Sequence, residues 1–176
     1  MSLCRTGFTV ILASSLAGCF ASKDEPEPPA PLPPTKIELR VEAEKDVNPN
    51  AEGKPSPVLL RIYELKGLTG FNAADYFALN QQDQTAIGAD LARKQELIIR
   101  PGEKKTYAIE PESGTGFLGA YAGFRSLGSA RWRVSSPITP HATSVWDLKL
   151  TGSQMILTAP PPAKPEPSKE TEEKEK

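Results

Sequence analysis

Side chains that could carry out catalysis are few in this chain of 176 residues. His141 is the only histidine, and it follows Pro140 in a stretch that we expect to be a loop. A zinc site, or a nucleophilic triad with its base, requires more groups than this one. Two of the many carboxylates could meet across the fold as a glycosidase-like pair, although most occupy alternating positions that keep a sheet soluble. The sequence therefore predicts a protein that is not an enzyme and holds no metal or other cofactor.

Cys19 is the residue whose setting indicates a definite reaction. It follows Leu16-Ala17-Gly18, which closes an apolar run that begins at Phe8, behind a head with the single basic residue Arg5. A charged start, a short apolar stretch and small residues at the cleavage point are typical of a secretory signal. The apolar run is well short of the ~20 residues that span a bilayer, which argues against a transmembrane helix.

A cysteine directly after the small pair resembles a bacterial lipobox. The resemblance implies that residues 1–18 are a lipoprotein signal peptide, that Cys19 is lipidated on sulfur, and that its new amino group is acylated. A structural disulfide is the alternative, but the other cysteine, Cys4, lies in the removed peptide. Several acyl chains would make the anchor stable, because each buried methylene contributes ~0.8 kcal/mol and one myristoyl chain is marginal.

Proline placement divides the rest of the chain. Six of the eighteen prolines lie between Pro26 and Pro34, and five more lie between Pro160 and Pro167. We therefore expect residues 19–34 to be a lipidated, proline-rich tether that reaches roughly 45 Å when extended. Residues 159–176 are expected to be a disordered tail rich in Pro, Glu and Lys, with partner binding as the alternative. Residues 35–158 have the size of one domain.

This domain is expected to be all-β. Ile37, Leu39 and Val41 alternate with charged residues, as in a half-buried strand, and the more apolar Val58–Leu65 fits a central strand. Eight such short segments with turn signals between them favour an antiparallel β-sandwich. Arg100-Pro101-Gly102-Glu103 predicts a type II turn, either within a hairpin or between two sheets.

A small helical insertion near residues 71–92 is predicted to interrupt the strands. Asn72 can cap a helix, Asp75 can complete a capping box, and Phe71 can pack on Tyr76. A second short helical turn is expected around residues 86–91. The insertion falls between the second strand and the Pro-Gly turn.

Two readings of the aromatic residues remain open. Tyr121, Phe124, Trp132 and Trp146 lie in or beside alternating segments, so they either fill the core or line a ligand cavity. The second reading keeps a periplasm-facing small-ligand carrier or sensor lipoprotein as an alternative function. A formal net charge of −1 gives no electrostatic argument for nucleic-acid binding.

Several motifs occur in an order and spacing that resemble one family. They are Asn48-Pro49-Asn50, Gly53-Lys54-Pro55-Ser56-Pro57-Val58, Arg61-Ile62-Tyr63-Glu64-Leu65, Ala74-Asp75-Tyr76-Phe77-Ala78-Leu79, Ile87-Gly88-Ala89-Asp90-Leu91 and Pro101-Gly102-Glu103. This set is similar to the TssJ family, also called SciN or VasD, of type VI secretion lipoproteins. The resemblance runs from Cys19 to about Thr158, and the charged tail is not part of the family pattern.

The resemblance implies a transthyretin-like β-sandwich of two four-stranded sheets with a helical insertion, and no catalysis. It implies membership of the secretion membrane complex through binding of the periplasmic carboxy-terminal region of the inner-membrane protein TssM (IcmF-like), with TssL completing the complex. In the family, the loop between the first two strands protrudes and contacts TssM.

That loop corresponds here to a segment with three prolines. Its residues are Lys45, Asp46, Val47, Asn48, Pro49, Asn50, Ala51, Glu52, Gly53, Lys54, Pro55, Ser56 and Pro57. It is longer than a usual hairpin loop, and its prolines lower the entropy lost when a partner binds. An ordinary surface crossover between sheets is the alternative.

The residue after the lipidated cysteine bears on sorting. Phe20 stands there in place of the aspartate that is associated with inner-membrane retention in enteric bacteria. We therefore expect the protein on the outer membrane, lipid-anchored and facing the periplasm.

Overall fold

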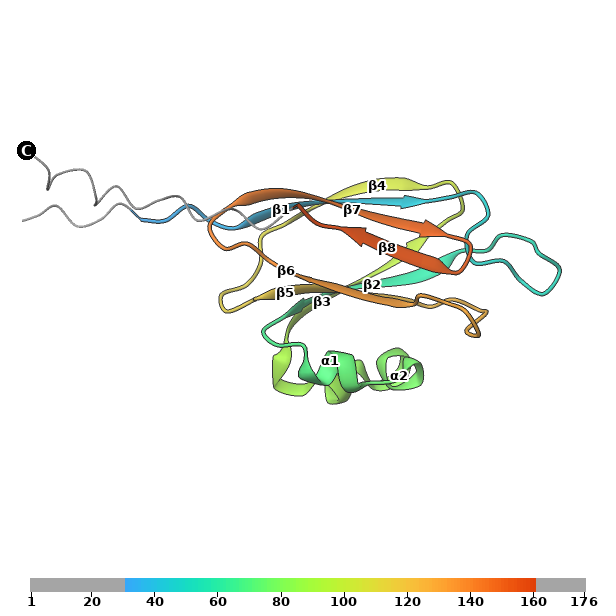
Figure 1. The fold of residues 1–176 in the computed structure, drawn as a ribbon, viewed down its shortest axis with the longest axis horizontal. Helices are drawn as coiled ribbons and strands as arrows, with labels where there is room; N and C mark the ends of the chain where they lie inside the picture. Colours follow the sequence, from blue (N-terminus) through green and yellow to red (C-terminus); the bar gives the residue numbers. More distant parts are fainter. Residues whose placement is uncertain (1–30, 161–176) are drawn as a thin grey trace, which may run out of the picture. The chain divides into compact units, whose positions relative to one another are not determined.

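Eight strands form two four-stranded sheets that pack face to face in the computed structural model, which describes residues 31–160 (Figure 1). The first sheet has the strand order β4-β1-β7-β8 and the second has β3-β2-β5-β6. The strands are β1 (Lys36–Ala43), β2 (Val58–Leu65), β3 (Leu91–Ile99), β4 (Lys104–Ile109), β5 (Phe117–Ala122), β6 (Arg133–Pro137), β7 (Thr143–Thr151) and β8 (Gln154–Thr158). The predicted all-β sandwich of two four-stranded sheets is confirmed.

Neighbouring strands are antiparallel with one exception, the pair β1 and β7. These two run parallel, with Leu39 opposite Trp146 and Val41 opposite Leu148. The direction of β7 follows from the connectivity. β6 ends in the second sheet, and the chain then crosses to the first sheet. It begins β7 at Thr143, opposite Lys36 at the start of β1, so the two strands run the same way. An antiparallel sandwich was the expectation, so this parallel pair is a detail that strand periodicity did not reveal.

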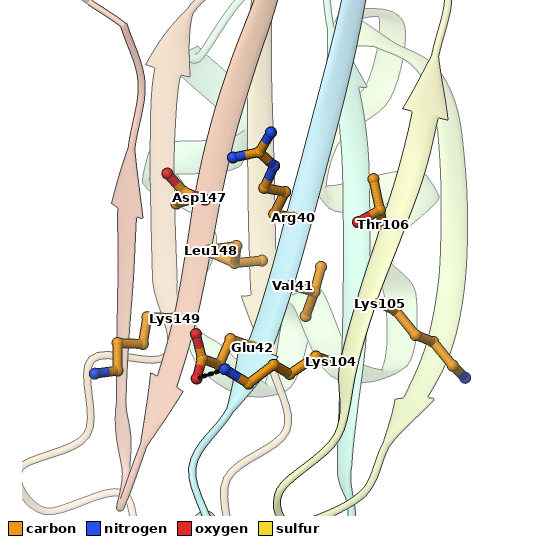
Figure 2. A pocket seen from close by; sticks show the side chains of 9 residues that line it. All are labelled: Arg40, Val41, Glu42, Lys104, Lys105, Thr106, Asp147, Leu148 and Lys149. Atoms are coloured by element: carbon orange, nitrogen blue, oxygen red, sulfur yellow. Dashed lines mark ion pairs between the residues drawn. The ribbon is translucent and has the colours of Figure 1, made fainter.

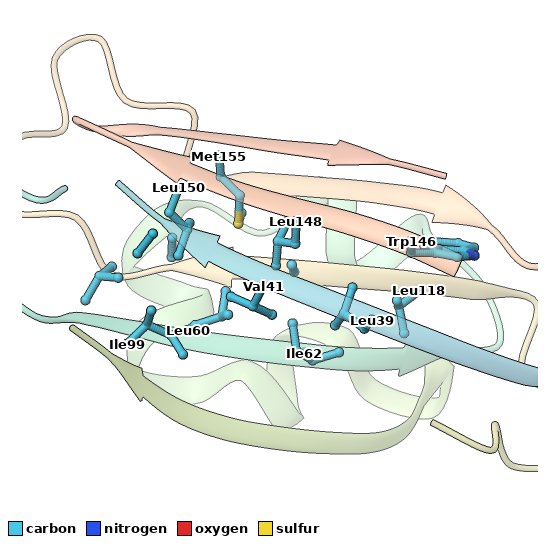
Figure 3. Packing of buried hydrophobic residues seen from close by; sticks show 14 of the residues in the cluster. Leu39, Val41, Leu60, Ile62, Ile99, Leu118, Trp146, Leu148, Leu150 and Met155 are labelled. Atoms are coloured by element: carbon cyan, nitrogen blue, oxygen red, sulfur yellow. The ribbon is translucent and has the colours of Figure 1, made fainter. Parts of the chain in front are cut away.

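The hydrophobic core lies between the two sheets (Figure 3). Leu39 and Val41 from β1 meet Leu60 and Ile62 from β2, and all four are at most 3% exposed. Each such side chain contributes about 1.5–3 kcal/mol through its burial. The alternation seen in the sequence is thus the alternation between this core and solvent.

The aromatic residues pack into two clusters. Trp146 and Phe124 belong to the core between the sheets, whereas Tyr121 lies on the opposite face of the second sheet, with Trp132 partly buried against it. Trp146, Phe124 and Tyr121 are each at most 2% exposed. Side chains therefore fill the space that a ligand carrier would need between its sheets, and core packing is confirmed for these three residues.

The Pro-Gly turn joins the two sheets. Gly102 has φ 76°, and the N–H of Glu103 donates to the carbonyl of Arg100 at 3.0 Å, as a type II turn requires. Since β3 and β4 lie in different sheets, the turn is the connection between sheets and not a hairpin within one.

A helical insertion covers the outer face of the second sheet (Figure 1). It consists of α1 (Thr69–Ala73), α2 (Tyr76–Ile87) and the short 3₁₀ helix η1 (Gly88–Asp90). The prediction that Asn72 caps the helix is wrong, since it lies inside α1 and the chain becomes extended at Ala74. Asp75 caps α2 instead, and its carboxylate accepts from the N–H of Ala78 at 2.7 Å. Phe71 packs on Tyr63 of β2, with ring centroids 5.5 Å apart.

A buried polar cluster holds α2 on the sheet. The guanidinium of Arg61 donates to the carbonyls of Leu79 and Asn80 at 2.7 and 2.9 Å, close to the point where α2 kinks at Gln82. The backbone departs from helical geometry at Gln82, and the arginine supplies hydrogen-bond donors to two carbonyls beside this kink.

Asp83 is the acid of this cluster. Its carboxylate accepts from the hydroxyl of Tyr63 at 3.0 Å and from the ammonium of Lys94 at 2.8 Å. Burial alone would raise the pKa of Asp83, but the hydrogen bonds from Lys94 and Tyr63 outweigh it and hold the pKa below its ordinary value. Burial raises the pKa of Tyr63 far above its ordinary value. This cluster is a structural clasp between helix and sheet.

Several predicted features lie outside the described residues. They include Cys19, the tether up to residue 30 and the tail from residue 161. Within residues 31–160, no helix combines the length and the apolar character needed to cross a membrane.

Candidate partner-binding loop

Residues 45–57 connect β1 to β2 and project beyond the ends of the sheets (Figure 1). They lie at the end of the sandwich opposite the start of β1, because β1 crosses the whole first sheet before it reaches them. Eight strand residues at about 3.3 Å each separate the two ends by roughly 25 Å.

The base of this loop is buried and hydrogen-bonded. Asn48 is 2% exposed and has a left-handed φ of 52°, and the neighbouring Val47 is fully buried. The side-chain amide of Asn48 donates to the carbonyl of Pro57 at 2.7 Å, and its Oδ1 accepts from the N–H of Arg125 at 2.8 Å. Its backbone N–H donates to the carbonyl of Gly152 at 2.7 Å. Asn48 therefore joins the loop to two other connections.

The tip of the loop is a closed turn. Asn50 uses its Oδ1 to accept from the N–H groups of Glu52 and Lys54, at 3.1 and 2.8 Å. Its backbone N–H also donates to the carbonyl of Lys54, at 2.9 Å, and Gly53 supplies a φ of 76°. Residues 51–55 are exposed, yet their backbone is held by these bonds. Such a segment loses little conformational entropy when a partner binds it.

The thirteen expected contact residues thus fall into two groups. Val47, Asn48 and Ser56 are buried and hold the loop, so they are not available as a surface. The exposed members are Lys45, Asp46, Ala51, Glu52, Gly53, Lys54, Pro55 and Pro57, with Pro49 and Asn50 half-buried. The tip, residues 50–55, is the part of the loop that a partner can reach.

Sequence reasoning missed the neighbours of this tip. A depression of about 550 Å³ lies beside the loop, lined by Pro49, Asn50, Ala51, Arg125, Ser126 and Ser153. The last three are 74 to 104 positions away from the first three along the chain, so spacing could not have pointed to them. Only the folded arrangement brings Arg125 next to the loop.

The outer face of the first sheet offers a second hollow, of about 360 Å³ (Figure 2). Its charges are mostly paired: Lys104 Nζ lies 2.6 Å from Glu42 Oε1, and Arg40 Nε lies 2.8 Å from Glu38 Oε1. Lys149, which also lines this hollow, and Thr151 donate hydrogen bonds to Glu44 and lower the pKa of its carboxyl. Paired, solvated side chains of both signs are typical of an exposed sheet face.

His141 lies near the start of β1, far from the loop. Its N–H donates to Thr35 Oγ1 at 2.8 Å, and its ring Nδ1 lies 3.0 Å from the carbonyl of Pro33. These contacts hold the chain where it enters the sandwich. In the part of the chain that the structure describes, no three His, Cys, Asp or Glu side chains gather as metal ligands would.

Comparisons with known proteins agree on one family. Residues 35–153 match the model of the family described as "Type VI secretion lipoprotein, VasD, EvfM, TssJ". The T6SS lipoprotein TssJ1 from Pseudomonas aeruginosa is 36% identical, with a TM-score of 0.70 over 74% of this chain and 100% of that chain. No curated protein matches the chain.

Two further solved structures share the fold. A chain in the structure described as "Type VI membrane complex" is 26% identical, with a TM-score of 0.60 over 72% of this chain and 98% of that chain. A chain in the structure described as "T6SS protein TssM C-terminal domain (869-1107) from EAEC" is 23% identical, with a TM-score of 0.57 over 70% of this chain and 97% of that chain.

Proposed function

The chain belongs to the TssJ family of type VI secretion lipoproteins, components of the secretion membrane complex, and from this premise we propose that it binds the periplasmic carboxy-terminal region of TssM. Through that contact it ties TssM, and indirectly TssL, to the outer membrane. Its role is structural, with lipid at one end and a protein contact at the other.

The observation that carries this proposal is the geometry of the loop. Its exposed tip is closed by Asn50, its base is held by Asn48, and it lies at the end of the sandwich away from the start of β1. The start of β1, where the expected tether joins, and the tip, where a partner would bind, are therefore separate ends of the sandwich. The description of one solved structure that contains this fold also names TssM.

Anchoring rests on residues outside the described part of the chain. Cys19 would carry the lipid, and Phe20 after it favours delivery to the outer membrane, on the periplasmic face. The expected tether, residues 19–34, gives the sandwich its reach into the periplasm.

Binding to a purified periplasmic fragment of TssM tests the proposal. Residues 31–160 would be compared with a variant whose tip, residues 50–55, is replaced by Gly and Ser at equal length. A double change, Glu38→Ser with Arg40→Ser, provides the control, since these exposed side chains bond to each other on the first sheet. We expect the control to bind like the parent and the tip variant to bind at least tenfold more weakly, the loss that truncating strong interface residues causes.

Two results would count against this assignment in different ways. If the parent fails to bind TssM, the proposed function is wrong. If the tip variant binds as well as the parent, the function stands and the contact lies elsewhere on the sandwich.

A further inference from the structure

We propose that the depression beside the loop receives an acidic side chain of the partner, and that Arg125 is the cationic group that binds it. The inference rests on the proposed function and adds the chemistry of the contact. The lining residues are Pro49, Asn50, Ala51, Arg125, Ser126 and Ser153.

Hydrogen-bond donors dominate the polar side chains of this depression. Arg125 is exposed, and among the described residues its hydrogen bond to Asn48 uses the backbone N–H, which leaves the guanidinium free. The Oδ1 of Asn50 already accepts from the N–H groups of Glu52 and Lys54, so the group that its side chain can offer a ligand is the NH₂, with two N–H donors.

The two serine hydroxyls can donate as well, and the lining contains no carboxylate. A guanidinium surrounded by neutral donors fits a carboxylate, which only accepts hydrogen bonds. Arginine is also enriched among residues that dominate binding at protein interfaces.

The position of Arg125 is set by the loop itself. Asn48 accepts from the N–H of Arg125 and donates to the carbonyl of Pro57, so one buried side chain ties the arginine to the loop. Phe124, directly before it, is 2% exposed and is anchored in the core. The backbone of Arg125 is therefore in place before a partner arrives, while its side chain stays free to move. Asn48 acts here as a positioning residue.

The location favours a protein carboxylate over a lipid phosphate. The depression lies at the loop end of the sandwich, and the chain enters β1 at the opposite end. Pro49, Asn50 and Ala51 belong both to this depression and to the loop proposed as the partner contact, so a protein bound on the tip lies beside Arg125.

A peptide titration followed by NMR tests the inference without TssM. The probe is a capped hexapeptide of alternating Glu and Gly, with the Gln version as its neutral match, added to labelled residues 31–160. We expect the acidic peptide to shift the signals of the Arg125 side chain, the Asn50 amide and the Ser126 and Ser153 backbone. The neutral peptide should leave them unmoved, and 0.5 M NaCl should weaken the effect. Shifts spread over the lysines of the surface, or no shift at these groups, would overturn the inference.

Charge reversal tests the same contact in the complex. Arg125→Glu should weaken binding to the TssM fragment at least about tenfold, more than Arg125→Lys, because a guanidinium binds a carboxylate with two parallel hydrogen bonds. Lys66→Glu makes the same change of charge at the other end of β2 and should leave binding within twofold. Equal affinities for Arg125→Glu and the parent would overturn the inference. If the parent itself does not bind TssM, the proposed function fails, and the peptide titration still decides the role of Arg125.

Discussion

Oδ1 of Asn48 accepts a hydrogen bond at 2.8 Å from the backbone N–H of Arg125, a residue 77 positions further along the chain. The bond joins the connection between β1 and β2 to the segment that follows β5. It places a loop tip and an arginine in one surface, and it makes the shape of that surface depend on one buried amide.

Asn48→Ala should destabilise the fold by about 2–4 kcal/mol. The change leaves the N–H of Arg125 and the carbonyl of Pro57 without their partner, and it places alanine at a left-handed φ of 52°. Urea denaturation measures the loss. Asn48→Gly separates the loss of the hydrogen bonds from the backbone strain, since glycine adopts a left-handed φ readily. We expect Asn48→Gly to lower the free energy of unfolding by about 1 kcal/mol less than Asn48→Ala does. Equal stability of all three proteins would contradict this account of Asn48.

Gly119→Ala should cost about 1–3 kcal/mol, through overpacking between the sheet and the helical insertion. A Cβ at this position would lie 2.9 Å from Leu65 Cδ1 and 3.1 Å from Phe71 Cζ. Gly128→Ala is the matched control, because no atom beyond its chain neighbours would lie within 4 Å of the added Cβ. Thermal unfolding should show a lower Tm for Gly119→Ala and a change of at most a few degrees for the control. A Tm for Gly119→Ala equal to that of the parent would show that the insertion is not tightly packed.

Asp83→Asn should lower the free energy of unfolding at pH 7 by about 2–4 kcal/mol, because Lys94 and Arg61 lose the acid that compensates them. The pKa of Asp83 is lower in the folded protein than its ordinary value of 3.8. Its stabilisation is therefore complete above that value and is lost as the pH falls through the lower, folded value.

Urea midpoints at pH 7 and pH 3 would reveal this dependence. The parent should lose more stability between the two pH values than Asp83→Asn does, and the gap between them should narrow in acid. Asp147→Asn, a change at an exposed carboxylate on β7, should follow the parent at both pH values. If Asp83→Asn lost as much stability as the parent between pH 7 and pH 3, the polar cluster around Asp83 would be ruled out as a source of acid sensitivity.

Cys19→Ser should abolish type VI secretion while residues 31–160 remain folded. The reason is that the change removes the thiol that is expected to carry the lipid, and leaves the sandwich and its loop untouched. Fractionation of cells would show the variant released from the membranes, and the soluble domain would bind the TssM fragment as before. A Cys19→Ser strain that still secretes would refute the role assigned to the anchor.

Much of the fold follows from local pattern, and the remainder depends on contacts between distant residues. Alternation located β1 and β7 because their inner faces are buried, and proline with glycine located the turn at Gly102. The N-cap of α2 was misplaced because Asn72 and Asp75 are both good caps. In the structure, residues 69–73 form a separate helix held by distant contacts: Phe71 packs on Tyr63, with ring centroids 5.5 Å apart, and Arg133 donates to the carbonyls of Phe71 and Ala74.

Part of the candidate site could likewise be predicted from the sequence, and part depends on contacts between distant residues. The loop was recognised by resemblance to a family, but its division into a buried base and an exposed tip needed the structure. Nothing near Arg125 in the sequence marks it as a neighbour of Asn50. The depression that they share is formed by three separate connections, those after β1, after β5 and after β7.

The place of β1 in its sheet has a mechanical consequence. β1 is an inner strand, paired along its length with β4 on one side and β7 on the other. Tension between the chain entering at Lys36 and a partner held on the loop would pull along the axis of β1. Because residues 36–57 are one continuous stretch of chain and β1 is already extended, the covalent backbone of β1 carries this load directly, and neither ladder of hydrogen bonds has to shear. The other strands are attached to β1 through the two ladders and take little of this load, so a pull between these two points does not peel the sandwich open from an edge.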